Sequence, residues 1–333
     1  MSYKTRYICL SFISICIMML NLQALHAQRL SSLDGMLEQR KKQFGGKIAM
    51  VVWKDTIVYK KFAGEDMTLN TQVPIGCTSA WLTAALAMTF VEQGKIDLDD
   101  PVAKYLPIYA TYAKSYLTIR HCLANVTGIE PEKGGIQKIF QKTKFPTLEE
   151  EVNAIAKREI KNNPAEVFYY NNYGSNIVGR ILEIVGRKSF DRLMMDRIFR
   201  PCGMKRSTFS TDMAVNPFNG GVTTAADFIK FEMMLLNKGM AGTKKVLSEP
   251  SIAEMQKVQT GNAKNIFVPA QTQGYVYGLG NWLRDGIITS PSLQGGWAYI
   301  DTKRKFAVLI LGETKEDKKE YYDDLINTVN ANL

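Results

Sequence analysis

Residues 77–94, CTSAWLTAALAMTFVEQG, decide the fold of this chain. Helix-forming residues run without interruption from Thr78 to Gln93, and Gly94 closes the segment. The apolar side chains of this segment are distributed around the whole circumference of the helix. A helix that is apolar on every face must be surrounded by protein. We therefore predict a buried central helix that begins near Cys77.

Segments rich in strand-forming residues lie on both sides of this helix in the chain. Residues 47–53 and 56–62, separated by Lys54-Asp55, are typical of a hairpin. Three more strands are predicted over residues 275–283, 296–300 and 306–311. Strands at the two ends of a chain form one sheet only if the residues between them are an insertion.

That insertion has helical periodicity. Helices are predicted over residues 118–125, 147–160, 172–185 and 189–199, and further helices over 30–44, 224–238 and 316–331. We predict an α/β protein of the α+β type, with a five-stranded, mostly antiparallel sheet flanked by helices and a helical subdomain. Residues 28–75 and 215–333 form the sheet part and residues 76–214 the helical part of a single domain, 28–333. The cleft between the two parts is the expected ligand site.

The N-terminus has the pattern of a signal peptide. Lys4 and Arg6 precede an apolar stretch over residues 7–20, and small residues allow cleavage before Gln28. Residues 1–27 are therefore predicted to be removed. The expected product is exported, periplasmic or extracellular, with no stable membrane anchor after cleavage.

Composition excludes several classes of site. The formal charge of +10 falls by two, to +8, with the signal, and the basic residues are scattered, so no nucleic-acid groove is expected. Cys77, Cys122 and Cys202 are an odd number without a C-x-x-C pair, and His121 is the one histidine of the mature chain. We expect no metal site, no cofactor, no disulfide framework and a monomeric protein. A Ser-His-Asp triad would need His121, and no G-x-S-x-G elbow accompanies it.

A series of short motifs in one order resembles the superfamily of serine β-lactamases, penicillin-binding proteins (DD-peptidases) and related esterases, especially its class C-like branch. The motifs cover essentially the whole mature chain: GKIDLDDPV at 94–102, KYLP at 104–107, TIRHCL at 118–123, FYYNNYG at 168–174, IFRPCGM at 198–204, GGVTT at 220–224 and YGLG at 277–280. The resemblance implies a β-lactamase/transpeptidase-like fold and acyl-enzyme hydrolysis of an amide or ester.

The resemblance also implies where the chemistry lies. The family has a serine nucleophile at the start of the buried helix and a lysine one turn later, so that both side chains share a face. These positions are occupied by Cys77 and Ala80 in this chain. Both halves of the activated nucleophile are thus replaced. The sequence predicts a pseudoenzyme, in which Cys77 is a buried and inert thiol.

Two further elements of the family pattern have counterparts. Tyr170 and Asn172 match a Tyr-x-Asn motif that supplies a proton-transfer hydroxyl and a substrate-orienting amide. A tyrosine with a reference pKa near 10 needs a nearby cation to act as a base. The third element, a strand lining the cleft, aligns with residues 289–292. There we expect Ser290 and Ser292 to contact a ligand, with the backbone N–H groups of Ser292 and Cys77 as oxyanion donors.

Three functions are consistent with these residues. The favoured hypothesis is an inactive or impaired member of the family that retains a cleft for a peptide-like or acyl ligand, such as a peptidoglycan-derived peptide. The second is a working amidase, esterase or β-lactamase-like hydrolase that uses Cys77 with Tyr170, since a helix N-terminus lowers a thiol pKa. The third is a structural or partner-binding protein.

Overall fold

The computed structural model describes residues 30–129, 144–292, 296–312 and 319–333. The predicted signal peptide lies outside these ranges. Among the described residues, no helix combines the length and the apolar character needed to cross a membrane.

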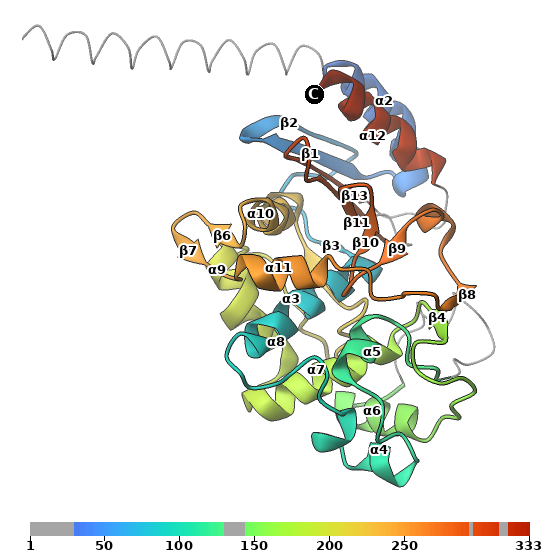
Figure 1. Cartoon of the computed structure of the whole chain (residues 1–333). Helices are drawn as coiled ribbons and strands as arrows, with labels where there is room; N and C mark the ends of the chain where they lie inside the picture. The colour runs from blue at the N-terminus through green and yellow to red at the C-terminus, as the bar shows by residue number, and fades with distance from the viewer. Residues whose placement is uncertain (1–29, 130–143, 293–295, 313–318) are drawn as a thin grey trace, which may run out of the picture.

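A seven-stranded antiparallel sheet forms the centre of the fold (Figure 1). Its strand order is β2-β1-β13-β12-β11-β10-β9, so strands from the two ends of the chain pair in the middle, with Ile48 opposite Gly312. The strands are β1 (Ile48–Lys54), β2 (Thr56–Ala63), β9 (Val276–Tyr277), β10 (Trp282–Arg284), β11 (Ile287–Pro291), β12 (Trp297–Asp301) and β13 (Phe306–Gly312). The predicted class and the antiparallel sheet are confirmed.

The predicted number of five strands was wrong. The single strand expected over residues 275–283 is two short strands, β9 and β10, separated by a turn at Gly278 and Gly280. Gly280 has a φ of 74°, a conformation that ends an extended strand. The chain then turns at Asp285-Gly286 and forms β11, which the sequence did not identify by its strand pattern.

The two faces of the sheet are covered by different helices (Figure 1). Strand β1 alternates between them: Met50 and Val52 pack with α2 and α12, whereas Ala49 and Val51 join the larger core on the opposite face. The helices on the first face are α2 (Ser32–Arg40) and α12 (Glu320–Asn332), with the short helix η1 (Lys41–Phe44); those toward the larger core include α3 (Ser79–Val91), α10 (Ala225–Leu236) and α11 (Glu249–Met255).

Helix α3 is the predicted central helix. Every residue from Ser79 to Phe90 is buried. The remaining helices are α4 (Ile108–Thr111), α5 (Ile119–Leu123), α6 (Leu148–Ala156), α7 (Tyr173–Gly186), α8 (Phe190–Met194) and α9 (Arg200–Cys202), with η2 (Gly76–Thr78), η3 (Val102–Lys104), η5 (Met195–Phe199) and η6 (Ala270–Thr272). Of these, α7, α8, η2 and η5 contact α3. The large apolar side chains of α3 contribute about 1.5–3 kcal/mol each on burial.

Three two-stranded sheets complete the described structure. They are β3 (Val73–Pro74) with β5 (Val222–Thr223), β4 (Val167–Tyr169) with β8 (Lys264–Phe267), and β6 (Met240–Ala241) with β7 (Lys244–Lys245). The first leads into α3, and the second leads directly into Tyr170. Both therefore fix segments on which the resemblance places functional residues.

Candidate active site

Cys77 lies in the turn η2, two residues before α3, and has no solvent-exposed surface. Its neighbours in sequence hold the turn in place. Thr78 Oγ1 donates to the carbonyl of Ser290 at 2.7 Å, and Ser79 Oγ donates to the carbonyl of Gly76 at 2.6 Å. The N–H of Gly221 donates to the same Ser79 hydroxyl. The thiol is therefore presented by a rigid turn at the N-terminal end of a 13-residue helix.

Ala80 is also buried, and the turn between β9 and β10 packs directly on it. A Cβ atom on Gly280 would lie only 2.4 Å from the Ala80 carbonyl oxygen. The methyl group of Ala80 provides no base. Where the resemblance implies a lysine, the chain instead packs a turn tightly against the helix backbone.

Tyr170 is brought against Cys77. It follows β4, is 1 % exposed, and its ring packs on those of Phe218, Trp282 and Tyr277 at centroid distances of 5.0, 5.3 and 5.8 Å. Burial raises the Tyr170 pKa well above its usual value, Cys77 and Tyr277 raise it further, and the Trp282 indole opposes part of the rise. The hydroxyl therefore stays protonated at neutral pH.

Asn172 faces a different neighbour. It is half-buried at the start of α7, and its Nδ2 donates to Glu151 of α6 at 3.3 Å. Asn176, one turn later, donates to the same carboxylate oxygen at 2.8 Å. In this structure the Asn172 amide thus helps to join α6 to α7. No sequence pattern indicates this pairing, because Glu151 lies on a separate helix.

The third predicted element, residues 289–292, lies next to Cys77. Thr289 faces away from it, since its hydroxyl accepts a hydrogen bond from the Trp297 indole on the α2 and α12 face. Ser290 therefore points to the opposite face, where its cross-strand partner Ala298 belongs to the larger core. This placement puts the Ser290 side chain on the same face of the sheet as Cys77.

The oxyanion role expected of the Ser292 N–H group was wrong for this structure. That N–H donates to the carbonyl of Gly296 at 2.7 Å. The hydrogen bond continues the β11–β12 ladder by one residue beyond the last pair, Pro291 and Trp297. Because the donor is used within the hairpin, it is not directed at a ligand. Ser292 itself is fully buried.

We define the Cys77 cluster as six buried residues: Cys77, Asn125, Tyr170, Tyr277, Trp282 and Ser290, each at most 3 % exposed. Tyr277 and Trp282 pack edge to face at 4.8 Å, and the pKa of Tyr277 is raised by burial and by Cys77. The Asn125 side chain lies near enough to Tyr277 to oppose part of that rise, but the two groups do not reach hydrogen-bond geometry.

Four polar atoms of the Cys77 cluster have no partner at hydrogen-bond geometry in the described part of the chain, although the Asn125 amide lies near the Tyr277 hydroxyl and the Trp282 indole near that of Tyr170. They are Asn125 Nδ2, Tyr277 Oη, Trp282 Nε1 and Ser290 Oγ. An unsatisfied buried polar group costs about 1–3 kcal/mol, so native proteins rarely gather several in one place. Sequence reasoning missed Asn125, Tyr277 and Trp282 as site residues. The YGLG motif and the polar residue after α5 were the available signals.

The other thiols lie outside this cluster. Cys122 and Cys202 are buried, and burial raises the pKa of Cys202 to about 12. Burial also raises the pKa of Cys122. Within the described ranges, no three His, Cys, Asp or Glu side chains are placed to hold a metal ion.

A separate cavity of about 440 Å³ lies between α6, α8 and residues 209–215. Its wall includes Arg180, which forms ion pairs with Glu149 and with Glu183 at 3.2 Å. None of the six residues of the Cys77 cluster lines it. The cavity therefore does not belong to the candidate active site.

Comparisons with known proteins agree with the fold described above. The Beta-lactamase family matches residues 33–331. A solved structure from Bacteroides dorei, described provisionally as a β-lactamase, is 26 % identical and superimposes with a TM-score of 0.80, covering 90 % of this chain and 98 % of the other. The octameric penicillin-binding protein homologue from Pyrococcus abyssi is 22 % identical, with a TM-score of 0.74 over 90 % of this chain and 77 % of the other, and shows the shared fold.

Curated relatives are similar over a shorter span. Two proteins, from Salmonella agona and Salmonella typhimurium, carry the provisional description D-alanyl-D-alanine carboxypeptidase. Each is 27 % identical over 224 residues, which is 59 % of this chain and 50 % of the relative. The chain thus matches about half the length of these relatives. With the family match extending over nearly all described residues, the chain belongs to the Beta-lactamase family, a family of hydrolases related to the penicillin-binding proteins.

Proposed function

We propose that this protein binds a peptide-like or acyl ligand at the Cys77 cluster and hydrolyses it slowly or not at all. It is proposed to act as an exported pseudoenzyme of its family. The expected ligand presents carbonyl groups, as a peptidoglycan-derived peptide does. The D-alanyl-D-alanine in the description of the Salmonella relatives supports the choice of a short peptide.

The direction of the Tyr170 pKa carries the proposal. Activation of a nucleophile requires a neighbouring group that accepts its proton. Tyr170 is a polar side chain packed against Cys77, and burial together with Cys77 and Tyr277 moves its pKa upward against a smaller lowering by Trp282. Ala80 does not oppose this shift, because it has no charge. The pair therefore lacks the base that an acyl-enzyme mechanism needs.

The four unpartnered polar atoms support ligand binding over a purely structural role. Asn125 Nδ2 and Trp282 Nε1 can only donate, and the hydroxyls of Tyr277 and Ser290 can donate as well. A carbonyl or ester oxygen accepts such hydrogen bonds. Satisfying these donors would remove part of the cost of burying them, which favours a ligand rich in acceptors.

The test is intact mass spectrometry after incubation with a β-lactam and with an activated ester, followed by thermal unfolding with N-acetyl-D-alanyl-D-alanine. We expect no covalent adduct, and a rise in Tm with the peptide that is lost in Ser290→Ala and in Asn125→Ala. Asn172→Ala tests the predicted ligand contact of that residue. If the peptide still raises the Tm of Asn172→Ala, the Asn172 amide does not bind the ligand and its role is the hydrogen bond to Glu151.

One observation favours the second candidate, a working hydrolase. The Cys77 thiol lies at the N-terminal end of α3, where the helix dipole stabilises a thiolate. A covalent adduct that disappears in Cys77→Ala would establish this alternative and overturn the proposal. If neither adduct nor ligand-dependent Tm shift occurs, the third reading, a structural or partner-binding protein, replaces both.

Restoring the family residues provides the complementary test. The double variant Cys77→Ser, Ala80→Lys supplies a nucleophile and a base on one helix face. We expect hydrolysis of a chromogenic cephalosporin or an activated ester to rise at least a hundredfold over that of the unmodified protein. The matched control is Cys77→Ser alone. It lacks the base, and we expect its rate of hydrolysis to stay at the level of the unmodified protein.

A further inference from the structure

The Cys77 cluster is built from two walls that belong to different parts of the fold. Asn125 follows α5, and its carbonyl accepts a hydrogen bond from Tyr169, which directly precedes Tyr170. Tyr277 and Trp282 lie on β9 and β10, at the edge of the sheet. Any change in the spacing of these two walls changes the site.

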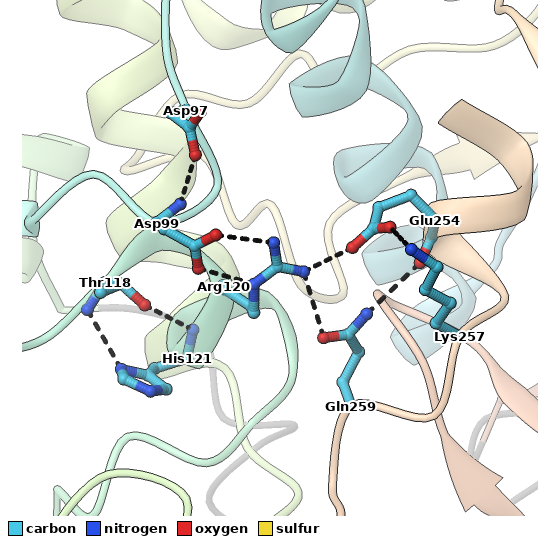
Figure 2. A network of polar contacts seen from close by, with 8 residues as sticks. All are labelled: Asp97, Asp99, Thr118, Arg120, His121, Glu254, Lys257 and Gln259. Carbon is cyan, nitrogen blue, oxygen red and sulfur yellow. Dashed lines mark hydrogen bonds and ion pairs between the residues drawn. The ribbon is translucent and has the colours of Figure 1, made fainter. Parts of the chain in front are cut away.

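Figure 2 shows a network of polar contacts between α5, the segment that precedes it, and α11. We call it the Arg120 network: Asp97, Asp99, Thr118, Arg120, His121, Glu254, Lys257 and Gln259. Arg120 lies on α5 and binds Asp99 through two hydrogen bonds of 2.7 and 2.9 Å. Its remaining Nη1 donates to Glu254 of α11 at 2.6 Å and to Gln259, which lies four residues beyond the end of α11, at 3.3 Å.

From α11 the connection continues through the backbone into the second wall. The carbonyl of Met255, next to Glu254, accepts hydrogen bonds from the Leu279 N–H at 3.0 Å and from Asn281 Nδ2 at 3.2 Å. The N–H of Gln259 donates to the carbonyl of Tyr277 at 2.9 Å. Glu254 is therefore adjacent to a residue that contacts the 277–282 segment, and Gln259 contacts that segment itself.

The second connection of Arg120 runs along α5 to Asn125 of the first wall. The N–H of Ala124 donates to the Arg120 carbonyl at 3.0 Å, and Asn125 follows immediately with a left-handed φ of 56°. Arg120 thus lies five residues before Asn125 on a short, hydrogen-bonded segment. One guanidinium is connected to both walls by short chains of contacts.

We propose that Arg120 is a positioning residue that holds the two walls of the Cys77 cluster at a fixed spacing. The planar guanidinium binds Asp99 with two N–H groups while a third reaches Glu254. A lysine offers a single point charge and cannot bind both carboxylates in this geometry. The significance for ligand binding rests on the proposed function of the cluster.

The test measures the accessibility of the Cys77 thiol, which does not require any ligand. Arg120→Gln and Arg120→Lys are treated with N-ethylmaleimide at neutral pH, and alkylation of each cysteine is followed by peptide mapping. We expect Cys77 to react at least tenfold faster in Arg120→Gln than in the unmodified protein, with a smaller increase in Arg120→Lys. The buried Cys202 serves as the internal control and should keep its rate.

The matched control is Arg180→Gln. Arg180 also joins two carboxylates, Glu149 and Glu183, on two helices, but it lines the separate cavity. It should leave the Cys77 rate and the near-ultraviolet circular dichroism of the protein unchanged, whereas Arg120→Gln alters both. If Arg120→Gln does not fold, Glu254→Gln provides the same readout with a milder change.

Two results would overturn the inference. Equal acceleration at Cys77 and Cys202 would mean general destabilisation, and an unchanged Cys77 rate in all three variants of this network would mean that Arg120 does not position the walls. Failure of the proposed function looks different. In that case no peptide stabilises the unmodified protein, yet Arg120→Gln still exposes Cys77.

Discussion

In the Cys77 cluster, four buried polar atoms have no partner among the described residues, whereas in the Arg120 network one guanidinium makes four hydrogen bonds near the surface. The two regions are joined through Met255 and Gln259. Paired groups at a partly exposed site contribute stability. Unpaired groups in the interior reduce stability, and such groups persist where binding requires them. The comparison separates residues whose polar groups are paired within the fold from residues that the proposed function assigns to ligand binding.

The largest expected effect comes from the turn between the two regions. Gly280→Ala places a Cβ atom 2.4 Å from the Ala80 carbonyl at a φ of 74°. We expect a loss of about 3 kcal/mol or more in the free energy of unfolding, from overpacking and backbone strain together. Urea denaturation measures it.

Gly242→Ala is the matched control for that change. Gly242 has a φ of 61° and open space around the position of a Cβ atom. Only the backbone term applies there, about 1–2 kcal/mol. Equal losses in the two variants would show that the turn does not pack on α3 as described.

The next effect tests the paired region. Arg120→Gln should lower the free energy of unfolding by about 1–2 kcal/mol, a value reduced by solvent screening because the side chain is 28 % exposed. Lys238→Gln, which removes an ion pair between two largely exposed side chains, should have no measurable effect in the same urea titration. A larger decrease in the free energy of unfolding for Lys238→Gln than for Arg120→Gln would contradict this prediction.

The unpaired region should respond in the opposite direction. Tyr277→Phe removes a buried hydroxyl that has no partner in the described structure, and it keeps the ring in place. We expect the free energy of unfolding to stay constant or to rise by up to about 1 kcal/mol. Calorimetry of the two proteins measures the change. A decrease in the free energy of unfolding of more than about 1 kcal/mol would reveal a partner for the hydroxyl.

The smallest effect concerns pH. The pKa of His121 is lowered from its usual 6.5 mainly by burial, so the folded protein favours the neutral ring, whose Nδ1 accepts the Thr118 N–H at 3.3 Å. Stability from this group is complete above pH 6.5 and decreases as pH falls below 6.5 toward the folded pKa. Asp99 opposes this shift in part.

His121→Asn retains a side-chain acceptor and cannot titrate. The difference in Tm between the unmodified protein and the variant should therefore be constant from pH 8 to pH 6.5. Below pH 6.5 the unmodified protein should lose Tm faster than the variant. Parallel profiles down to pH 5.5 would show that His121 does not couple to folding.

Local sequence patterns predicted the elements that depend on local chemistry. The all-round apolar composition of α3 and the hairpin at Lys54-Asp55 needed no knowledge of distant residues. Strand β11 was missed by pattern because its last residues, Thr289, Ser290 and Pro291, are polar or lack a backbone donor, and its burial comes from β10 and β12. Tertiary context overrode propensity there.

The site was predictable in its positions and less so in its contacts. Family resemblance named Cys77, Ala80 and Tyr170, and the structure places Tyr170 against Cys77, with Ala80 in the first turn of α3. It could not indicate that Asn172 contacts Glu151, that the Ser292 N–H closes a hairpin, or that Arg120 reaches Glu254. Each of these contacts joins residues far apart in the chain, and no local spacing encodes such pairs.

The pairing of β1 with β13 has a consequence for how the chain acquires its structure. Ile48 and Gly312 are neighbours in the sheet, but nearly the whole polypeptide separates them. The helices between them depend on near-neighbour contacts and can form as the chain emerges. The sheet must wait until residues 306–312 are available, so its closure is a late, slow step with a large loop to fold back. Until that step, the hairpin of β1 and β2 has two unpaired edges, and the edge of β1 that later pairs with β13 is exposed to pairing with other chains.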